Sequence, residues 1–171
     1  MSAVSDKLGM KKILKRVQKS QSLTAFLKLS SHLTAVLSAL AFGYLAVVSA
    51  RVSLMSLLEL CAILGVPFLA VTLIRHRINA PRPYELYDFY KVSPKKKGGM
   101  SFPSRHAYSA FAIGTALCFE SPLLGGILLL FSVLMCFARV LLGIHFLRDV
   151  LTGALVGTLS VLIGTFIFSL V

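Results

Sequence analysis

The sequence is poor in acidic residues, in cysteine and in charge as a whole, and each shortage excludes a class of protein. Only 6 of the 171 residues are aspartate or glutamate. No acidic cluster is present that could hold magnesium, so we expect any site in this chain to work without a metal or another cofactor. The cysteines are an odd number without close spacing, which argues against a disulfide framework and against a cysteine metal site. They are Cys61, Cys118 and Cys136.

The scarcity of charge also excludes an ordinary soluble domain. Charged residues make up 14% of the chain and hydrophobic residues 57%, and the mean hydropathy is +0.85. These values indicate an integral membrane protein, and the length suits one domain. A net charge of +12 would suggest nucleic acid as the partner of a soluble chain. Here the basic residues lie outside the apolar segments, so anionic membrane lipids and phosphate-bearing substrates are the expected partners, and nucleic acid is not.

The apolar segments predict an all-α bundle of about five transmembrane helices in a multi-pass protein of the cell membrane. A stretch of about 20 apolar residues crosses a bilayer as a helix, and somewhat shorter ones still fit a bundle. No internal repeat is present. The five segments are Leu33–Ala50, Ser53–Ile74, His106–Phe119, Leu123–Ala138 and Val150–Val171.

A basic N-terminal segment, residues 1–32, precedes the transmembrane domain, residues 33–171. On a helical wheel this segment places apolar side chains such as Leu14 and Val17 on one face and lysines on the other. Such a pattern is typical of an amphipathic helix in the interface of an anionic leaflet. A disordered basic tail is the alternative, and both stay open.

The distribution of basic residues predicts the orientation. With five crossings, residues 1–31, 75–105 and 139–149 lie on one side of the membrane, and that side holds every lysine and arginine except Arg51. The positive-inside rule makes this side cytoplasmic. An extra crossing that included residues 20–31 would invert the orientation.

The polar stretch 138–149 lies between the last two apolar segments and contains Arg139, His145 and Asp149. A charge at membrane depth costs about 2.5–3.5 kcal/mol on insertion scales, so this group indicates a function. On a helix, His145 and Asp149 would share one face, and the carboxylate would accept the Nδ1 proton and leave Nε2 free. A helix break at Gly143 would bring Arg139 towards the pair. An interfacial anchor cluster is the alternative interpretation.

Two further polar stretches lie in the loop 75–106, on the same side. The first runs from Arg75 to Arg82, which is flanked by prolines, and the second is Pro103-Ser104-Arg105-His106 at a helix start. Backbone N–H groups at a helix start, with a hydroxyl and an arginine, suit an anion. Two histidines suit phosphoryl transfer, in which one attacks phosphorus and the other protonates the departing oxygen.

These stretches resemble the type 2 phosphatidic acid phosphatase family, which shares its site with the vanadium haloperoxidases. The family signature reads Lys-x6-Arg-Pro, Pro-Ser-Gly-His and Ser-Arg-x5-His-x3-Asp. The chain has the three parts in this order, each at a membrane boundary. They are Arg75-x6-Arg82-Pro83, Pro103-Ser104-Arg105-His106 and Ala138-Arg139-x5-His145-x3-Asp149. The family has a six-helix core, and the segment 1–32 would stand in for its first helix.

The resemblance implies a role for each matched residue. His145 would be the nucleophile that forms a phosphohistidine, Asp149 would orient it, and His106 would protonate the leaving group. The expected phosphate-binding residues are Arg75, Arg82, Ser104, Arg105 and Arg139. The chain departs from the family at three of its positions: Arg75 stands for lysine, Arg105 for glycine and Ala138 for serine. Arg77 competes with Arg75 for its role, and Arg105 could point to the lipid instead.

The resemblance therefore implies a membrane-embedded, metal-independent phosphatase that hydrolyses a lipid phosphate or a polyprenyl diphosphate. Candidate substrates are undecaprenyl diphosphate, phosphatidylglycerol phosphate and phosphatidate. A lipid phosphotransferase would use the same site to pass the phosphoryl group to another lipid. A non-catalytic lipid-binding or transport protein is the third hypothesis.

Overall fold

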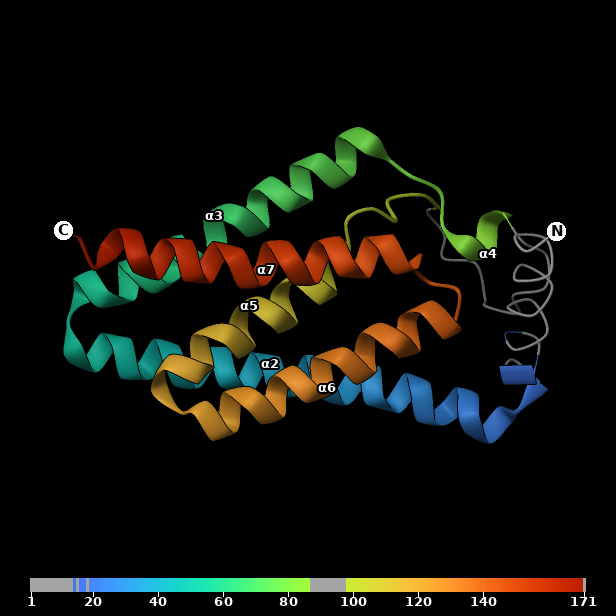
Figure 1. The fold of residues 1–171 in the computed structure, drawn as a ribbon, viewed down its shortest axis with the longest axis horizontal. Coiled ribbons are helices and arrows are strands. Elements are labelled where there is room, and N and C mark those ends of the chain that lie inside the picture. The colour runs from blue at the N-terminus through green and yellow to red at the C-terminus, as the bar shows by residue number, and fades with distance from the viewer. Residues whose placement is uncertain (1–13, 15, 18, 87–97, 171) are drawn as a thin grey trace, which may run out of the picture.

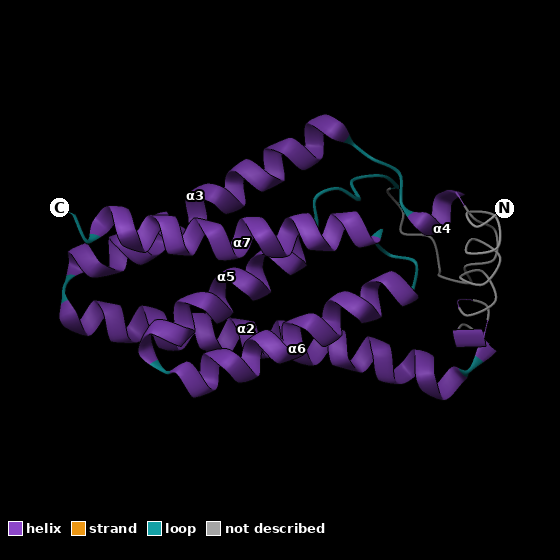
Figure 2. Cartoon of the chain, in the orientation of Figure 1, coloured by secondary structure: helices purple, strands orange, loops and turns teal. Residues whose placement is uncertain are grey.

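The computed structural model describes residues 14, 16, 17, 19–86 and 98–170, and its regular elements within these residues are all helices (Figures 1 and 2). In order they are α2 (Gln21–Val52), α3 (Leu54–Ile78), α4 (Pro83–Leu86), α5 (Arg105–Glu120), α6 (Pro122–Leu141) and α7 (Leu147–Phe168). Four spans, namely α2, α3 with α4, α6 and α7, are long and apolar enough to cross a membrane. The prediction of an all-α integral membrane bundle is confirmed.

Single serines form the turns at one end of the bundle. Ser53 ends α2 and caps α3, and its side chain accepts a hydrogen bond from the Ser56 N–H. Ser121 does the same between α5 and α6, with Pro122 at the first helical turn. A serine cap satisfies one of the free N–H groups of a helix start, and so short a connection makes the two helices antiparallel neighbours. The longer connections after α3 and after α6, of which the structure describes residues 79–82, 98–104 and 142–146, therefore lie at the opposite end (Figure 1).

The 16-residue helix α5 lies at the centre of the bundle, against α2, α3, α6 and α7 (Figure 1). It is about 24 Å long at 1.5 Å per residue, which is short for a full crossing. Glycines let α7 approach α5 closely. A Cβ at Gly153 would lie 2.5 Å from the Ser104 carbonyl oxygen, and a Cβ at Gly157 would lie 2.5 Å from the Tyr108 carbonyl oxygen. This contact fixes the first half of α7 beside the start of α5.

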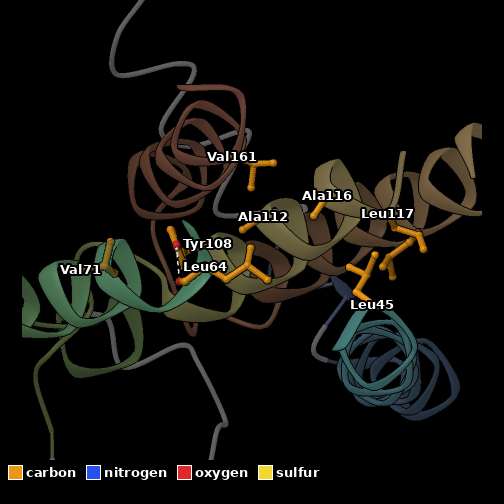
Figure 3. Close-up of a cluster of buried hydrophobic side chains, with 9 residues drawn as sticks. Leu45, Leu64, Val71, Tyr108, Ala112, Ala116, Leu117 and Val161 are labelled. Carbon is orange, nitrogen blue, oxygen red and sulfur yellow. Dashed lines mark hydrogen bonds between the residues drawn. The ribbon is translucent and has the colours of Figure 1, made fainter. Parts of the chain in front are cut away.

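The buried core lies along α5 (Figure 3). At its centre the Tyr108 hydroxyl donates to the Leu64 carbonyl oxygen of α3 at 2.8 Å, so the buried phenol is paired. Many large apolar side chains of α2, α3, α6 and α7 are exposed, as expected for helices that face lipid.

The first helix is longer than the predicted segment Leu33–Ala50. It starts at Gln21 and runs without a break through residue 32. Its additional turns bury Ser30 and Ser31, whose hydroxyls donate to the Leu27 carbonyl oxygen within the helix. Most of the predicted amphipathic helix lies outside the described residues, although Leu14 and Val17 are buried. The division of the chain at residue 32 stays a prediction.

Candidate active site

The polar segments meet at one end of the bundle and are tied together by hydrogen bonds. The Arg75 guanidinium, in the last turn of α3, donates through Nη1 to the Pro103 carbonyl oxygen at 3.1 Å. The Ser104 N–H donates to the Asp149 carbonyl oxygen at 3.0 Å. These bonds connect the end of α3, the start of α5 and the start of α7, so the matched stretches form one site.

A tight turn between α6 and α7 positions His145. Gly143 adopts a φ of 71°, which side-chain-bearing residues rarely take, and the N–H groups of Ile144 and His145 both donate to the Arg139 carbonyl oxygen. The helix break predicted at Gly143 is therefore present. The expectation that His145 shares a helix with Asp149 is wrong, because α7 begins only at Leu147.

The start of α7 is set by Asp149 itself. Its Oδ2 atom accepts a hydrogen bond at 2.9 Å from the N–H of Phe146, the N-cap residue. The carboxylate thus satisfies a free N–H group at the start of its own helix. A negative charge is stabilised at a helix N-terminus. His145 lies in the bend before the helix, and its Nδ1 atom still comes within 3.6 Å of Oδ2. Both side chains are buried, at 1% and 0% exposure.

Ser101 joins this pair, although the sequence analysis did not select it. Its hydroxyl lies 2.5 Å from Oδ2 of Asp149 and 3.4 Å from Nδ1 of His145, and the residue is fully buried. Its place two residues before Pro103, at the edge of the second matched stretch, was the available signal. No spacing rule distinguishes it from other serines.

Burial lowers the pKa of the His145 imidazole from 6.5 to about 4. The Asp149 carboxylate beside the ring opposes this shift, while the charges of Arg139 and Arg82 reinforce it. The ring is therefore neutral at pH 7, as a nucleophile must be. The unfolded chain takes up this proton at higher pH than the folded protein, so the group favours unfolding as the pH falls from about 6.5 to about 4.

Buried arginines supply the positive charge of the site. Arg82 donates through Nε to the Gly99 carbonyl oxygen at 3.0 Å and through Nη1 to that of Ile144 at 3.4 Å. The Nε atom of Arg75 is buried and has no hydrogen-bond partner among the described residues. An oxyanion would satisfy such a donor.

Of the two arginines that compete for the first position of the signature, Arg75 is buried and Arg77 is exposed. Arg139, in the last turn of α6, is half-buried, and its Nε lies 3.4 Å from the Met135 sulfur. Arg75 is close enough to Arg82, Arg105 and Arg139 to be affected by their charges. A group of arginines so close together attracts an anion strongly.

The second matched stretch opens α5 as predicted. Ser104 is the fully buried N-cap, and its Oγ accepts from the Ala107 N–H at 3.4 Å. Arg105 and His106 form the first turn and line a cavity of about 460 Å³. The other lining residues are Thr34, Ala35, Ser38, Ala39, Phe42, Phe68, Ser109, Ala110, Ile113 and Met135.

This cavity is continued along α5 by a second one of about 420 Å³. Phe42, Phe68, Ser109 and Ile113 line both, and the walls are mainly apolar. The two cavities together provide an apolar groove between α2, α3 and α5, with Arg105 and His106 at one end.

Fold and site together define a helical integral membrane protein with a buried histidine–aspartate pair and an arginine-rich anion site at one end of the bundle. The sequence profile of the PAP2 superfamily matches residues 56–169, which include all three matched stretches. The chain belongs to this superfamily, and the resemblance to the type 2 phosphatidic acid phosphatases is confirmed.

Individual relatives agree with this assignment. The undecaprenyl-diphosphatase BcrC of Bacillus subtilis is 35% identical over 88 residues, which are 52% of this chain and 44% of that protein. The chain thus matches less than half the length of this relative. LpxE of Aquifex aeolicus has a similar structure, with a TM-score of 0.69, 25% identity and coverage of 90% of this chain and 93% of that one.

A second solved structure shares the fold. It is a transmembrane PAP2-type phosphatidylglycerolphosphate phosphatase from Bacillus subtilis, with a TM-score of 0.65 and 23% identity. The similarity covers 98% of this chain and 88% of that one.

Proposed function

We propose that this protein is a membrane lipid phosphatase that acts through a phosphohistidine on His145. The observation that carries the proposal is a fully buried imidazole beside Asp149, at the same end of the bundle as the buried arginines. Burial lowers the pKa of this imidazole to about 4, which favours its neutral form at pH 7. Such an arrangement suits attack on an anionic phosphorus, since the nucleophile is unprotonated and the phosphate charge is matched by fixed cations.

The reaction has two steps. In the first, Nε2 of His145 forms a bond to the terminal phosphorus, and the bond from that phosphorus to the leaving oxygen breaks. The leaving oxygen is the lipid oxygen of a monophosphate or the bridging oxygen of a diphosphate, and His106 donates a proton to it. In the second, water gives a proton to His106 and attacks the phosphohistidine, which releases inorganic phosphate and restores the imidazole. Arg75, Arg82 and Arg139, with Ser104, hold the phosphate oxygens.

A polyprenyl diphosphate is the substrate class that we favour. Arg105 and His106 lie where the apolar groove meets the site, so a hydrocarbon chain in the groove would place its phosphate groups beside both side chains. Arg105, which stands where the family has glycine, adds a cation for the second phosphate. The similarity to an undecaprenyl-diphosphatase supports the same class.

A substrate panel tests the function. Purified protein in liposomes is given undecaprenyl diphosphate, phosphatidylglycerol phosphate or phosphatidate, and free phosphate is measured. We expect kcat/KM for the diphosphate to exceed the others by about tenfold, because one added charged hydrogen bond contributes about 1.5–3 kcal/mol. Absence of phosphate release from every lipid would refute a phosphatase. A new phospholipid in place of free phosphate would show the phosphotransferase instead.

We also propose that the site faces the cytoplasm. With five crossings, the stretches that carry the candidate site share one side of the membrane with every lysine and arginine of the sequence except Arg51, and the positive-inside rule makes that side cytoplasmic. The test is a variant without the three native cysteines and with Lys96→Cys, exposed to an impermeant thiol reagent. We expect labelling only after the cells are opened, and labelling of intact cells would place the site on the outer face.

A further inference from the structure

We propose that Ser101 is a positioning residue that links the imidazole of His145 to the carboxylate of Asp149. The inference rests on the proposed function, since it assigns a role within the same site. Ser101 lies outside the positions matched to the family signature, and its contacts alone suggest the role.

The distances favour a bridge over a direct bond. Nδ1 of His145 and Oδ2 of Asp149 are 3.6 Å apart, which is beyond the range of a good hydrogen bond. The Ser101 Oγ is closer to each of them, at 3.4 Å from Nδ1 and 2.5 Å from Oδ2. The hydroxyl therefore stands between the two groups that the sequence predicted to pair directly.

The chemistry of the three groups fixes the direction of the bonds. An ionised carboxylate only accepts, so the single Ser101 proton is donated to Asp149. The Ser101 oxygen can then accept only from an Nδ1–H group of His145. This order selects the neutral tautomer with its proton on Nδ1, and it leaves the Nε2 lone pair free for phosphorus.

Ser101 is held in place from the opposite side of the site. Its own N–H donates to the Ala80 carbonyl oxygen at 2.8 Å, in the connection that follows α3. The two residues before it are also fixed, since the Met100 N–H donates to Asn79 Oδ1 and the Gly99 N–H to Glu85 Oε1. The Ser101 hydroxyl thus holds the Asp149 carboxylate and the His145 imidazole in a fixed position relative to the connection between α3 and α5.

The carboxylate depends on this contact. Oδ1 of Asp149 has no hydrogen-bond partner among the described residues, and Arg148 Nε, on a 70% exposed side chain, is 3.6 Å away. Within hydrogen-bond distance, Oδ2 has the Ser101 hydroxyl and the Phe146 N–H. Removal of the hydroxyl would leave both the carboxylate and Nδ1 under-paired, and the imidazole free to turn.

The experiment is a double-mutant cycle of Ser101→Ala and Asp149→Asn in the purified protein, with the lipid that the parent hydrolyses fastest. We expect S101A to lower kcat on the order of 100-fold, the typical cost of misplacing a reacting group, and to change KM by less than about threefold. Because Ser101 acts through Asp149, the double variant should match D149N within about twofold. Ser101→Thr, which keeps the hydroxyl, should recover most of the rate.

A second readout separates positioning from mere structural support. S101A should move the acid limb of the kcat/KM–pH profile, since the hydroxyl takes part in holding the Nδ1 proton. The matched control is Ser132→Ala, which removes another fully buried hydroxyl, bonded to the Leu128 carbonyl oxygen within α6. It should leave rate and profile as in the parent. Should S101A fail to accumulate, Ser101→Cys, of similar shape but with a weak donor, is expected to show the same loss.

The proposal is overturned if S101A keeps the parental kcat or if its pH profile does not move. It is also overturned if the fold-loss of kcat in the double variant equals the product of the losses in S101A and D149N. These results require an active parent, and so they differ from a failure of the proposed function, in which the parent itself releases no phosphate from any lipid. An inactive parent would overturn both.

Discussion

His145→Ala is expected to abolish phosphate release, with kcat falling by roughly four orders of magnitude or more. Alanine removes the atom that would bond to phosphorus, and the described contacts of the site place no second neutral imidazole beside Asp149. Phosphate release from lipid substrate is the first measurement. The second is rapid acid-free quenching with labelled substrate, which should trap an acid-labile phosphoprotein in the parent and none in the variant.

The matched control for His145→Ala is His76→Ala. His76 is an exposed histidine in the last turn of α3, at the same end of the bundle and at a position that the family signature leaves unspecified. Its replacement should leave both phosphate release and the trapped phosphoprotein at parental levels. If H145A formed the phosphoprotein as the parent does, another residue would be the nucleophile, and the assignment of His145 would fail.

Hydropathy and motif spacing predicted the bundle and most of the site because both depend on local sequence. The predicted third segment, His106–Phe119, differs from α5 by one residue at each end. Its boundaries are set by the serine caps Ser104 and Ser121, which sequence shows directly. The matched stretches likewise fall at helix ends, where polar groups have backbone partners.

The start of α2 was missed because its first turns contain polar residues that hydropathy assigns to water. Ser30 and Ser31 are buried, and their hydroxyls donate to the Leu27 carbonyl oxygen of their own helix. Thr34 also reaches the Phe131 carbonyl oxygen of α6. A hydroxyl that is satisfied in this way can lie inside a bundle, but a hydropathy window counts it as polar.

The position of Ser101 was not predictable for a different reason. Its role depends on the approach of the 98–104 segment to α7, and that approach follows from packing between residues far apart in sequence, such as Gly153 on Ser104. The spacing of His145 and Asp149 suggested a shared helix, whereas the carboxylate caps α7 and leaves the histidine outside. Motifs therefore predicted the candidate reacting groups and not the bonds that hold them.

Arg82→Lys is expected to lower kcat/KM by about 10²–10³-fold, the typical cost of one lost donor to a transition-state oxyanion. Arg82 has two structural bonds besides its charge, to the carbonyl oxygens of Gly99 and Ile144, so it joins the loop that carries Ser101 to the turn that carries His145. A lysine keeps the charge but is a single point donor, and it cannot make both bonds and still contact a phosphate.

The Arg82→Lys result separates charge from geometry. If the site needed only a cation here, R82K would be close to the parent and Arg82→Gln would be inactive. If the planar guanidinium is needed, as the two loop contacts indicate, R82K and R82Q should be impaired to a similar extent. Arg77→Gln is the matched control, since it removes an exposed arginine from the adjacent end of α3 and should leave kcat/KM within about twofold. A parental rate in R82K would show that the Arg82 bonds to the two loops contribute nothing to catalysis.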